Sequence, residues 1–569
     1  MDAAGRLEES GYPIRRAYDF HVIVLKSATQ MGLPQMALGA TAMMAAVSQA
    51  AGTRIFEMIA YSQAAQLELI LGNPDEAARK YDLARRLFGT FGESSEANVY
   101  WRVTQAGWLE AHRNREELYR ILKEAKGQNP SGRDELYFTR KIVASLCRLE
   151  LRAGHEDAVE ALAVPFLNTA ASVGKAQPGA IRAYLPEIET TATSLTTALL
   201  KAGRPEEALA AWHRFVGVRE RLMGGGERVA RPTRLEPGTA VLTVADLGGG
   251  AALWLTTSKS VEFTWAGSGY RHLIERIRLL SRLSRMDSAP ESRIAKEARG
   301  IFAVLFPSGV KGISAVGVES SGEFNTLPLA LFSYSDEGKN IAYSFLPFGG
   351  AVSAANRNAD HITTVAATTF DHELTRGGEI AGSVDDEVES IAAKFVKRES
   401  IRGRAATARA LDAAAGHDGV LHFAGHAIPW HGRVGLMVTP DARDSDADGR
   451  AGIWAMPRTK RMKSELVVFS ACATGGFEDP GTIRPGQLTE AALLAGAGEA
   501  VATLWPVNSE ATMAYMNLFY AHYVAGETVA AALRSASLEM RSTNRWKHPR
   551  YWAPFAVYSR LSGGITTNN

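Results

Sequence analysis

A turn between two helices recurs about every 40 residues in the first part of the chain. From about residue 15 to residue 223 there is almost no strand signal, and each polar turn is followed by a small or apolar residue. The equivalent residues Ala77, Leu118 and Ala158 are 41 and 40 positions apart. A repeat of this length predicts a helical solenoid, in which each helical hairpin buries its apolar surface against its neighbours. The turns are Gly72-Asn-Pro-Asp-Glu-Ala77, Arg113-Asn-Arg-Glu-Glu-Leu118, Gly154-His-Glu-Asp-Ala158 and Gly203-Arg-Pro-Glu-Glu-Ala208.

Small and large side chains alternate on the helix faces of one of these hairpins. Tyr61, Ala65 and Leu69 share one face of the first helix, and Ala77 and Tyr81 share a face of the second. This alternation resembles that of tetratricopeptide repeats. The spacing is longer than the usual tetratricopeptide period of about 34 residues, so an irregular helical domain without true repeats is the alternative interpretation.

The helical pattern stops at Met223-Gly-Gly-Gly226. Because glycine interrupts regular structure, we predict a helical repeat domain over residues 1–223 and a linker over residues 224–236. Strand-like and helix-like segments alternate from residue 237 to residue 569, which predicts a second, α/β domain built as a three-layer sandwich around a largely parallel sheet. One helix is predicted from Asp385 to Val396, with Ser383 as its N-cap.

Two apolar, strand-like runs of this second domain each end in a reactive side chain. One run, from Gly419, ends at His426, and the other, from Glu465, ends at Cys472. The carboxyl ends of parallel strands meet at one edge of a sheet, where sites commonly form. We therefore predict a catalytic pair with Cys472 as the nucleophile and His426 as the general base and acid, and with backbone N–H groups at Ala427 and Cys472 as oxyanion donors.

Several separated segments of the second domain are similar to the CHAT family of caspase-like peptidases, which often accompany tetratricopeptide repeats. The resemblance runs from about Pro237 to Ser559 and implies a caspase-type fold and a cysteine endopeptidase with a His426–Cys472 dyad. The similar segments are Asn325-Thr-Leu-Pro-Leu-Ala-Leu-Phe, Asp385-Asp-Glu-Val, His422-Phe-Ala-Gly-His426, Leu466-Val-Val-Phe-Ser-Ala-Cys472, Ala500-Val-Ala-Thr-Leu-Trp-Pro-Val-Asn-Ser-Glu510 and His548-Pro-Arg-Tyr-Trp-Ala-Pro-Phe555.

Two departures from the family pattern bear on activity. The family usually has glycine after the histidine, whereas this chain has Ala427, which resists a positive φ and so would reorient a donor at that turn. The segment from Phe477 to Arg484 also replaces the usual acidic and glycine-rich stretch after the cysteine. We expect these differences to affect substrate specificity or regulation.

Other candidate residues have a structural interpretation beside a functional one. His422 and Trp505 are candidates to line the cleft, but a packing role is the stronger expectation for His422. Asp448 belongs to an acidic segment, Asp444 to Gly449, that starts like a calcium loop but has Ala455 where the bidentate glutamate is needed. We interpret that segment as a surface loop whose carboxylates face a substrate groove or solvent.

The composition limits the partners and the cellular location. Sixty-three Lys and Arg against sixty-one Asp and Glu leave a net charge of +2, which indicates neither nucleic-acid nor membrane binding. The two cysteines, Cys147 and Cys472, make neither a disulfide framework nor a zinc quartet, and Cys147 is expected in the helical core. Without a signal peptide or a membrane-spanning run, we predict a cytoplasmic protein that requires no metal or other cofactor.

The leading hypothesis is a cysteine endopeptidase that cleaves a specific protein, with the helical repeats binding the target or a protein activator. A catalytically inactive caspase-like scaffold is the alternative, supported by Ala427. Thiol-dependent chemistry on a non-peptide acyl substrate is a third possibility, because the same dyad supports it.

Overall fold

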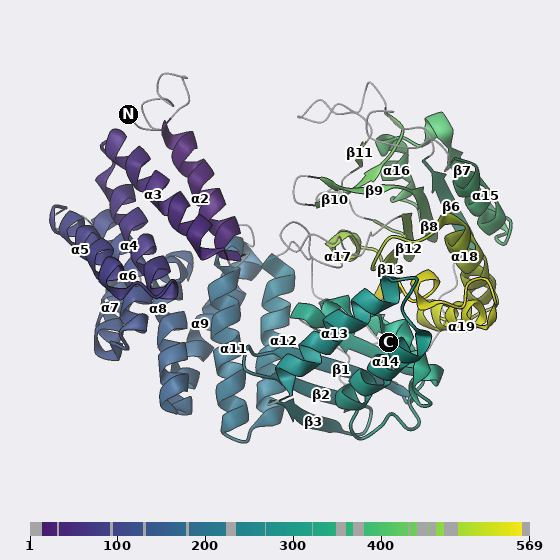
Figure 1. Cartoon of the computed structure of the whole chain (residues 1–569), viewed down its shortest axis with the longest axis horizontal. Coiled ribbons are helices and arrows are strands. Elements are labelled where there is room, and N and C mark those ends of the chain that lie inside the picture. The colour runs from purple at the N-terminus through teal and green to yellow at the C-terminus, as the bar shows by residue number, and fades with distance from the viewer. Residues whose placement is uncertain are drawn as a thin grey trace, which may run out of the picture. The chain divides into compact units, whose positions relative to one another are not determined.

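The computed structural model divides the chain into two compact units, Met1–Leu222 and Met223–Asn569. We describe each unit by itself (Figure 1). The structure describes residues 14–30, 33–91, 95–128, 132–177, 181–222, 235–267, 269–320, 322–348, 360–367, 381–430, 433–440, 453–454, 462–471 and 487–559.

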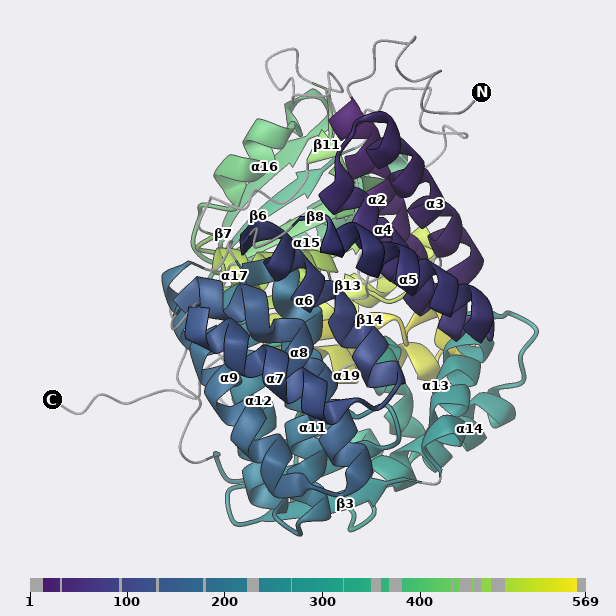
Figure 2. The same cartoon turned by 90° about the vertical axis from the view of Figure 1, so that its left-hand side faces the viewer.

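In its described residues, the first unit is entirely helical and is packed as a series of hairpins. The hairpins α4/α5, α6/α7, α8/α9 and α11/α12 follow one another, and α4, α6, α8 and α11 contact each other in that order (Figure 2). The expected helical repeat architecture is therefore confirmed. The helices are α2 (Ile14–Gln30), α3 (Pro34–Ala50), α4 (Arg54–Ile70), α5 (Pro74–Gly89), α6 (Ser95–Ala111), α7 (Arg115–Gln128), α8 (Gly132–Ala153), α9 (Glu156–Ala176), η1 (Arg182–Tyr184), α11 (Leu185–Lys201) and α12 (Pro205–Leu222).

The turns of this unit share one backbone geometry. At the turn between α4 and α5, the N–H groups of Gly72 and Asn73 donate to the carbonyl oxygens of Leu69 and Glu68 at 3.2 and 2.9 Å. These bonds satisfy carbonyls at the end of the helix and require a left-handed residue, for which glycine carries no steric penalty. The left-handed residues of five such turns are Gly52 (φ 64°), Gly72 (81°), Arg113 (55°), Gly154 (77°) and Gly203 (73°).

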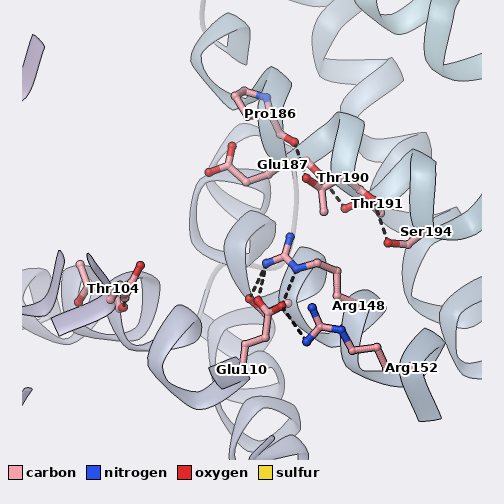
Figure 3. A network of polar contacts seen from close by, with 11 residues as sticks. Thr104, Glu110, Arg148, Arg152, Pro186, Glu187, Thr190, Thr191 and Ser194 are labelled. Atoms are coloured by element: carbon pink, nitrogen blue, oxygen red, sulfur yellow. Dashed lines mark hydrogen bonds and ion pairs between the residues drawn. The ribbon is translucent and has the colours of Figure 1, made fainter. Parts of the chain in front are cut away.

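An ion-pair network joins consecutive hairpins of the first unit. Figure 3 shows the Arg148 guanidinium of α8 facing both carboxylate oxygens of Glu110 in α6, and the Nε–Oε1 distance is 2.6 Å. Arg152 Nη1 lies 4.0 Å from the same carboxylate. The Glu110 side chain is only 12% exposed, so this two-pronged contact is less screened by solvent than a surface pair. It fixes α8 against α6.

The second unit is built on an eleven-stranded sheet with the order β3-β2-β1-β4-β5-β14-β13-β12-β8-β6-β7. From β13 through β12, β8 and β6 to β7, every neighbouring pair is parallel, as the alternation of strands and helices predicted. The strands are β1 (Thr239–Asp246), β2 (Ala251–Thr257), β3 (Val261–Ala266), β4 (Ala315–Glu319), β5 (Ala342–Phe345), β6 (His361–Ala366), β7 (Lys397–Arg402), β8 (Val420–Gly425), β12 (Leu466–Ala471), β13 (Glu499–Thr503) and β14 (Phe555–Ser559).

Helices cover both faces of this sheet and complete the three layers. In Figure 1, α15 and α18 lie together on one side of β8 and β12, and α17 lies on the other side. One buried cluster of apolar side chains extends through most of the unit. The helices are α13 (Tyr270–Arg285), α14 (Glu291–Leu305), η2 (Gly322–Thr326), η3 (Leu329–Tyr334), η4 (Gly338–Asn340), α15 (Ala381–Ala392), η5 (Gly403–Ala405), α16 (Ala408–Ala414), α17 (Gln487–Ala495), α18 (Ser509–Val524), α19 (Val529–Ser542) and η6 (Pro549–Tyr551).

Two local features differ from the sequence prediction. Helix α15 begins at Ala381, so Ser383 lies inside the helix and is not its N-cap. The apolar face predicted for this helix is nevertheless buried, as Val388 and Ile391 show. The sequence analysis did not predict a second, small antiparallel sheet. It consists of β9 (Ala427–Trp430), β10 (Arg433–Met437) and β11 (Ile453–Trp454).

We predict that Gly203→Ala lowers the free energy of unfolding of the helical unit by about 1 kcal/mol, because alanine is strained at positive φ. An added Cβ would meet nothing within 4 Å, so the cost arises in the backbone alone. Chemical denaturation of the full chain, followed by circular dichroism, measures the change.

The matched control is Gly39→Ala, inside α3, where the Cβ also meets open space. This substitution should raise the stability by about 1 kcal/mol, since alanine is the better helix former. Equal effects of the two substitutions would contradict the assigned turn geometry.

Candidate active site

The candidate site lies where two central parallel strands end. Strands β8 and β12 pair in register from Val420↔Leu466 to Gly425↔Ala471. The residues that follow these last partners in the sequence are His426 and Cys472. Cys472 itself lies outside the described residues. The two predicted dyad residues therefore follow a pair of residues that lie opposite each other on neighbouring strands. Neighbouring strands in a sheet are about 4.8 Å apart.

His426 occupies the junction between the large sheet and the small one. It follows the last residue of β8 and precedes the first residue of β9, and its carbonyl oxygen accepts a hydrogen bond from Met437 N–H at 2.9 Å. Its side chain is half-buried, and this burial lowers the pKa of His426 below its ordinary value because the charged imidazolium is poorly solvated. At neutral pH the ring is therefore neutral, which is the form that a general base needs.

Gly425 lies close to atoms of Phe423 and Ala367 at the end of β8. A Cβ at this position would lie 3.1 Å from the Phe423 ring and 3.3 Å from the carbonyl oxygen of Ala367. Ala367 N–H also donates to the carbonyl of Ala424, which continues the pairing of β6 with β8 to this level. The Phe-Ala-Gly-His sequence thus contains glycine where a side chain would push β8 away from its neighbours.

Ala427 has an extended backbone, and its N–H group takes no part in the hydrogen bonding between β9 and β10. Among the described residues, Arg113 is the single non-glycine residue at positive φ, so Ala427 carries no such strain. Met437 N–H bonds to His426, and Ala427 is paired with Leu436. Hydrogen-bonded and non-hydrogen-bonded pairs alternate in antiparallel strands, so the Ala427 N–H points away from β10.

His422, which we considered as a cleft-lining residue, lies instead in the core. Its side chain is 0% exposed. Its Nε2 lies 3.1 Å from Glu387 Oε1, and its Nδ1 lies 3.1 Å from the Tyr520 hydroxyl. Ser470 Oγ–H donates to the same Glu387 oxygen at 2.5 Å. The structure thus gives His422 the packing and hydrogen-bonding role that was the stronger expectation.

The other members of this buried group were not found from the sequence. Glu387 belongs to α15, Ser470 to β12 and Tyr520 to α18, so the group gathers four elements of the fold. One signal was present: Glu387 lies on the apolar side of its helix, one residue before the buried Val388. A carboxylate in that position needs a buried partner, but the sequence does not identify which one.

Trp505, the other candidate cleft-lining residue, is also buried. It is 2% exposed, its indole N–H donates to the carbonyl of Arg550 at 3.1 Å, and the Arg285 guanidinium lies 5.7 Å from its ring centre. Asp448 lies outside the described residues.

Cys147 is fully buried in α8, and burial raises the pKa of its thiol to about 12, which confirms its place in the helical core.

The described residues contain no group of three or more His, Cys, Asp or Glu side chains arranged to hold a metal ion. Within the same part of the chain, no helix has both the length and the apolar character needed to cross a membrane.

Comparison with known proteins identifies a family model that matches the second unit. A model of the CHAT domain family matches residues 262–560, which is more than half of the chain. Ninety-nine residues, 17% of this chain, are 32% identical to tetratricopeptide repeat protein 28 of Mus musculus and cover 4% of that protein's length. Two structures of the separase–securin complex of Saccharomyces cerevisiae are similar over 98% and 96% of this chain, at 9% identity and TM-scores of 0.48 and 0.44. This chain spans 47% of the length of each yeast chain.

The burial of His426 predicts its titration. In the folded protein, its NMR midpoint should lie below 6.5, with the resonance assigned by its loss in His426→Ala. The unfolded state then binds more protons as the pH falls below 6.5, so the His426 contribution to stability is present above that pH and is lost as the pH falls through the folded pKa. A midpoint above 6.5 would contradict the neutral resting ring.

Proposed function

This chain belongs to the CHAT domain family, and on that premise we propose that it is a caspase-like cysteine endopeptidase that cleaves a specific protein target. In this proposal Cys472 is the nucleophile and His426 is the general base and acid. The observation that carries the proposal is the register of β8 and β12, because their last paired residues, Gly425 and Ala471, immediately precede His426 and Cys472.

The chemistry proceeds in two stages. The neutral His426 ring takes the proton of the Cys472 thiol, and the thiolate attacks the carbonyl carbon of the scissile bond. The resulting oxyanion accepts a hydrogen bond from the Ala427 N–H, which is directed away from β10. Collapse breaks the C–N bond as His426 returns the proton to the leaving amine, and water then hydrolyses the thioester with His426 again acting as base.

Ala427 gives less support to an inactive scaffold than its sequence position suggested. That hypothesis depended on a requirement for positive φ after the histidine, and Ala427 adopts an extended conformation that any residue accepts. Glycine and alanine provide the same N–H donor there. The replacement is therefore compatible with catalysis.

The first unit is proposed to bind the protein target or a protein activator. Helices α2 and α3, the residue before α3 and the first turn of α4 expose several large apolar side chains, each between 38% and 62% accessible. Exposed apolar side chains that gather on neighbouring elements are a common feature of protein-binding surfaces. They are Phe20, Ile23, Leu33, Met36 and Phe56.

Thiol labelling tests the dyad directly. In full-length Cys147→Ala protein, Cys472 is the only cysteine, so iodoacetamide uptake reports on it alone. We expect His426→Ala in the same background to slow labelling at pH 6.5 at least tenfold, because the neutral ring no longer takes the thiol proton as the sulfur is alkylated. Equal rates with and without His426 would contradict the dyad.

Mapping of new protein termini in cells tests proteolysis. Cells with the native chain should contain cleavage products that Cys472→Ala and His426→Ala each reduce by about 10³-fold or more. Cys147→Ala is the matched control and should leave cleavage unchanged, since that thiol is buried in the other unit. Full cleavage by purified Cys472→Ala would overturn the assignment, and a thiol that labels rapidly without any new termini would favour a non-peptide acyl substrate.

A further inference from the structure

A connected set of hydrogen bonds lies in the core beneath the candidate site. Burial raises the pKa of Tyr520 well above its usual value, so its hydroxyl remains protonated. This hydroxyl lies 3.1 Å from His422 Nδ1, and a hydroxyl can either donate to or accept from that nitrogen. His422 Nε2 lies 3.1 Å from Glu387 Oε1, which also accepts from Ser470 Oγ–H at 2.5 Å. With the ring proton on Nε2, Glu387 Oε1 accepts a hydrogen bond from His422 as well as from Ser470.

These bonds tie both strands of the candidate site to the same carboxylate oxygen. His422 lies in β8, four residues before His426, and Ser470 lies in β12, two residues before Cys472. Both donate to Glu387 Oε1, at 3.1 and 2.5 Å. A sliding or twisting movement of one strand against the other would break at least one of these bonds. The carboxylate therefore fixes the strands relative to each other close to their carboxyl ends.

The surrounding packing lets Glu387 reach the sheet. Ala366 and Ala424 are register partners on neighbouring strands, and Ala424 is also the partner of Ser470. The two alanines pack against Val384 and Val388 of α15 in a separate buried cluster. Small side chains at this level allow the helix to approach closely, which places a short acidic side chain within reach of β8 and β12.

Further contacts fix the elements that carry the group. Asn517 of α18 donates to the Ser390 hydroxyl of α15 at 2.9 Å, which joins the two helices that supply Tyr520 and Glu387. Thr503 of β13 donates to the carbonyl of Ala471 at 3.1 Å, at the last residue of β12. These contacts join α15 to α18 and β12 to β13, and so limit the movement of the elements that carry Glu387, Tyr520 and Ser470.

We propose that Glu387, with His422, Ser470 and Tyr520, is a positioning residue that aligns His426 with Cys472 by fixing the ends of β8 and β12. This role rests on the proposed cysteine peptidase function and adds to it the residues that position the catalytic pair. Glu387 acts through the strands and does not contact the reacting atoms. Its two accepted hydrogen bonds, and not its charge, do the positioning.

The experiment compares two replacements of Glu387 in the full-length Cys147→Ala protein, with iodoacetamide as the probe. Glu387→Gln keeps an oxygen that accepts from Ser470 and His422, so labelling of Cys472 at pH 6.5 should remain within threefold of the parent. Glu387→Leu removes the acceptor at similar volume and should slow labelling at least tenfold, because His426 is then no longer aligned to take the thiol proton. The matched control, Glu389→Leu, changes an exposed carboxylate of the same helix and should match the parent.

Each contrary result has a distinct meaning. A folded Glu387→Leu protein with the parent's labelling rate would overturn the positioning role while leaving the dyad intact. Slowing of Glu387→Gln to the level of Glu387→Leu would overturn it as well, because charge would then be the active property. If Glu387→Leu does not fold, Ser470→Ala removes one of the two hydrogen bonds, and a rate equal to the parent's overturns the role. Loss of His426 dependence in the parent would remove the proposed function and this role together.

Discussion

The parallel pairing of β8 with β12 is the constraint on which the candidate site depends. Parallel strands run in the same direction, so their carboxyl ends lie at one edge of the sheet. The register decides which residues at those strand ends are opposite each other. Here the register aligns Gly425 with Ala471, one residue before His426 and Cys472. A shift of one position would place each partner's side chain on the other face of the sheet. The chemistry proposed for this chain therefore rests on hydrogen bonds between main-chain atoms.

Several independent contacts hold that register. Strand β6 continues the pairing on the outer side of β8, and β13 continues it beyond β12. The carboxylate of Glu387 adds side-chain hydrogen bonds from both central strands on the face covered by α15 and α18. Such a buried polar group stabilises a fold less than apolar packing would, but it accepts only one alignment of its partners. Specific alignment is what a two-residue catalytic pair needs.

The two units use different physical means to build a repeatable structure. In the helical unit the two helices of each of the four hairpins from α4 to α12 are joined by the same left-handed turn, so the local sequence is enough to define where these helices stop. Glycine occupies four of the five turns and Arg113 the fifth, which shows that hydrogen bonding of the turn tolerates a strained residue. At the candidate site of the α/β unit, β8 pairs with β6 and β12, which do not adjoin it in the chain. Local sequence defines the strands there but not their neighbours.

The sequence by itself determined the two-part architecture, the helical turns and the strand ends at which His426 and Cys472 occur. These features depend on local composition and on hydrophobic period, which neighbouring residues encode. Only the tertiary structure decided that β8 and β12 are adjacent, that His422 and Trp505 lie in the core, and that Ala427 is extended. It also decided that Glu387 meets Ser470 across 83 positions of chain. Contacts of that range depend on which elements pack together, and packing is a property of the whole domain.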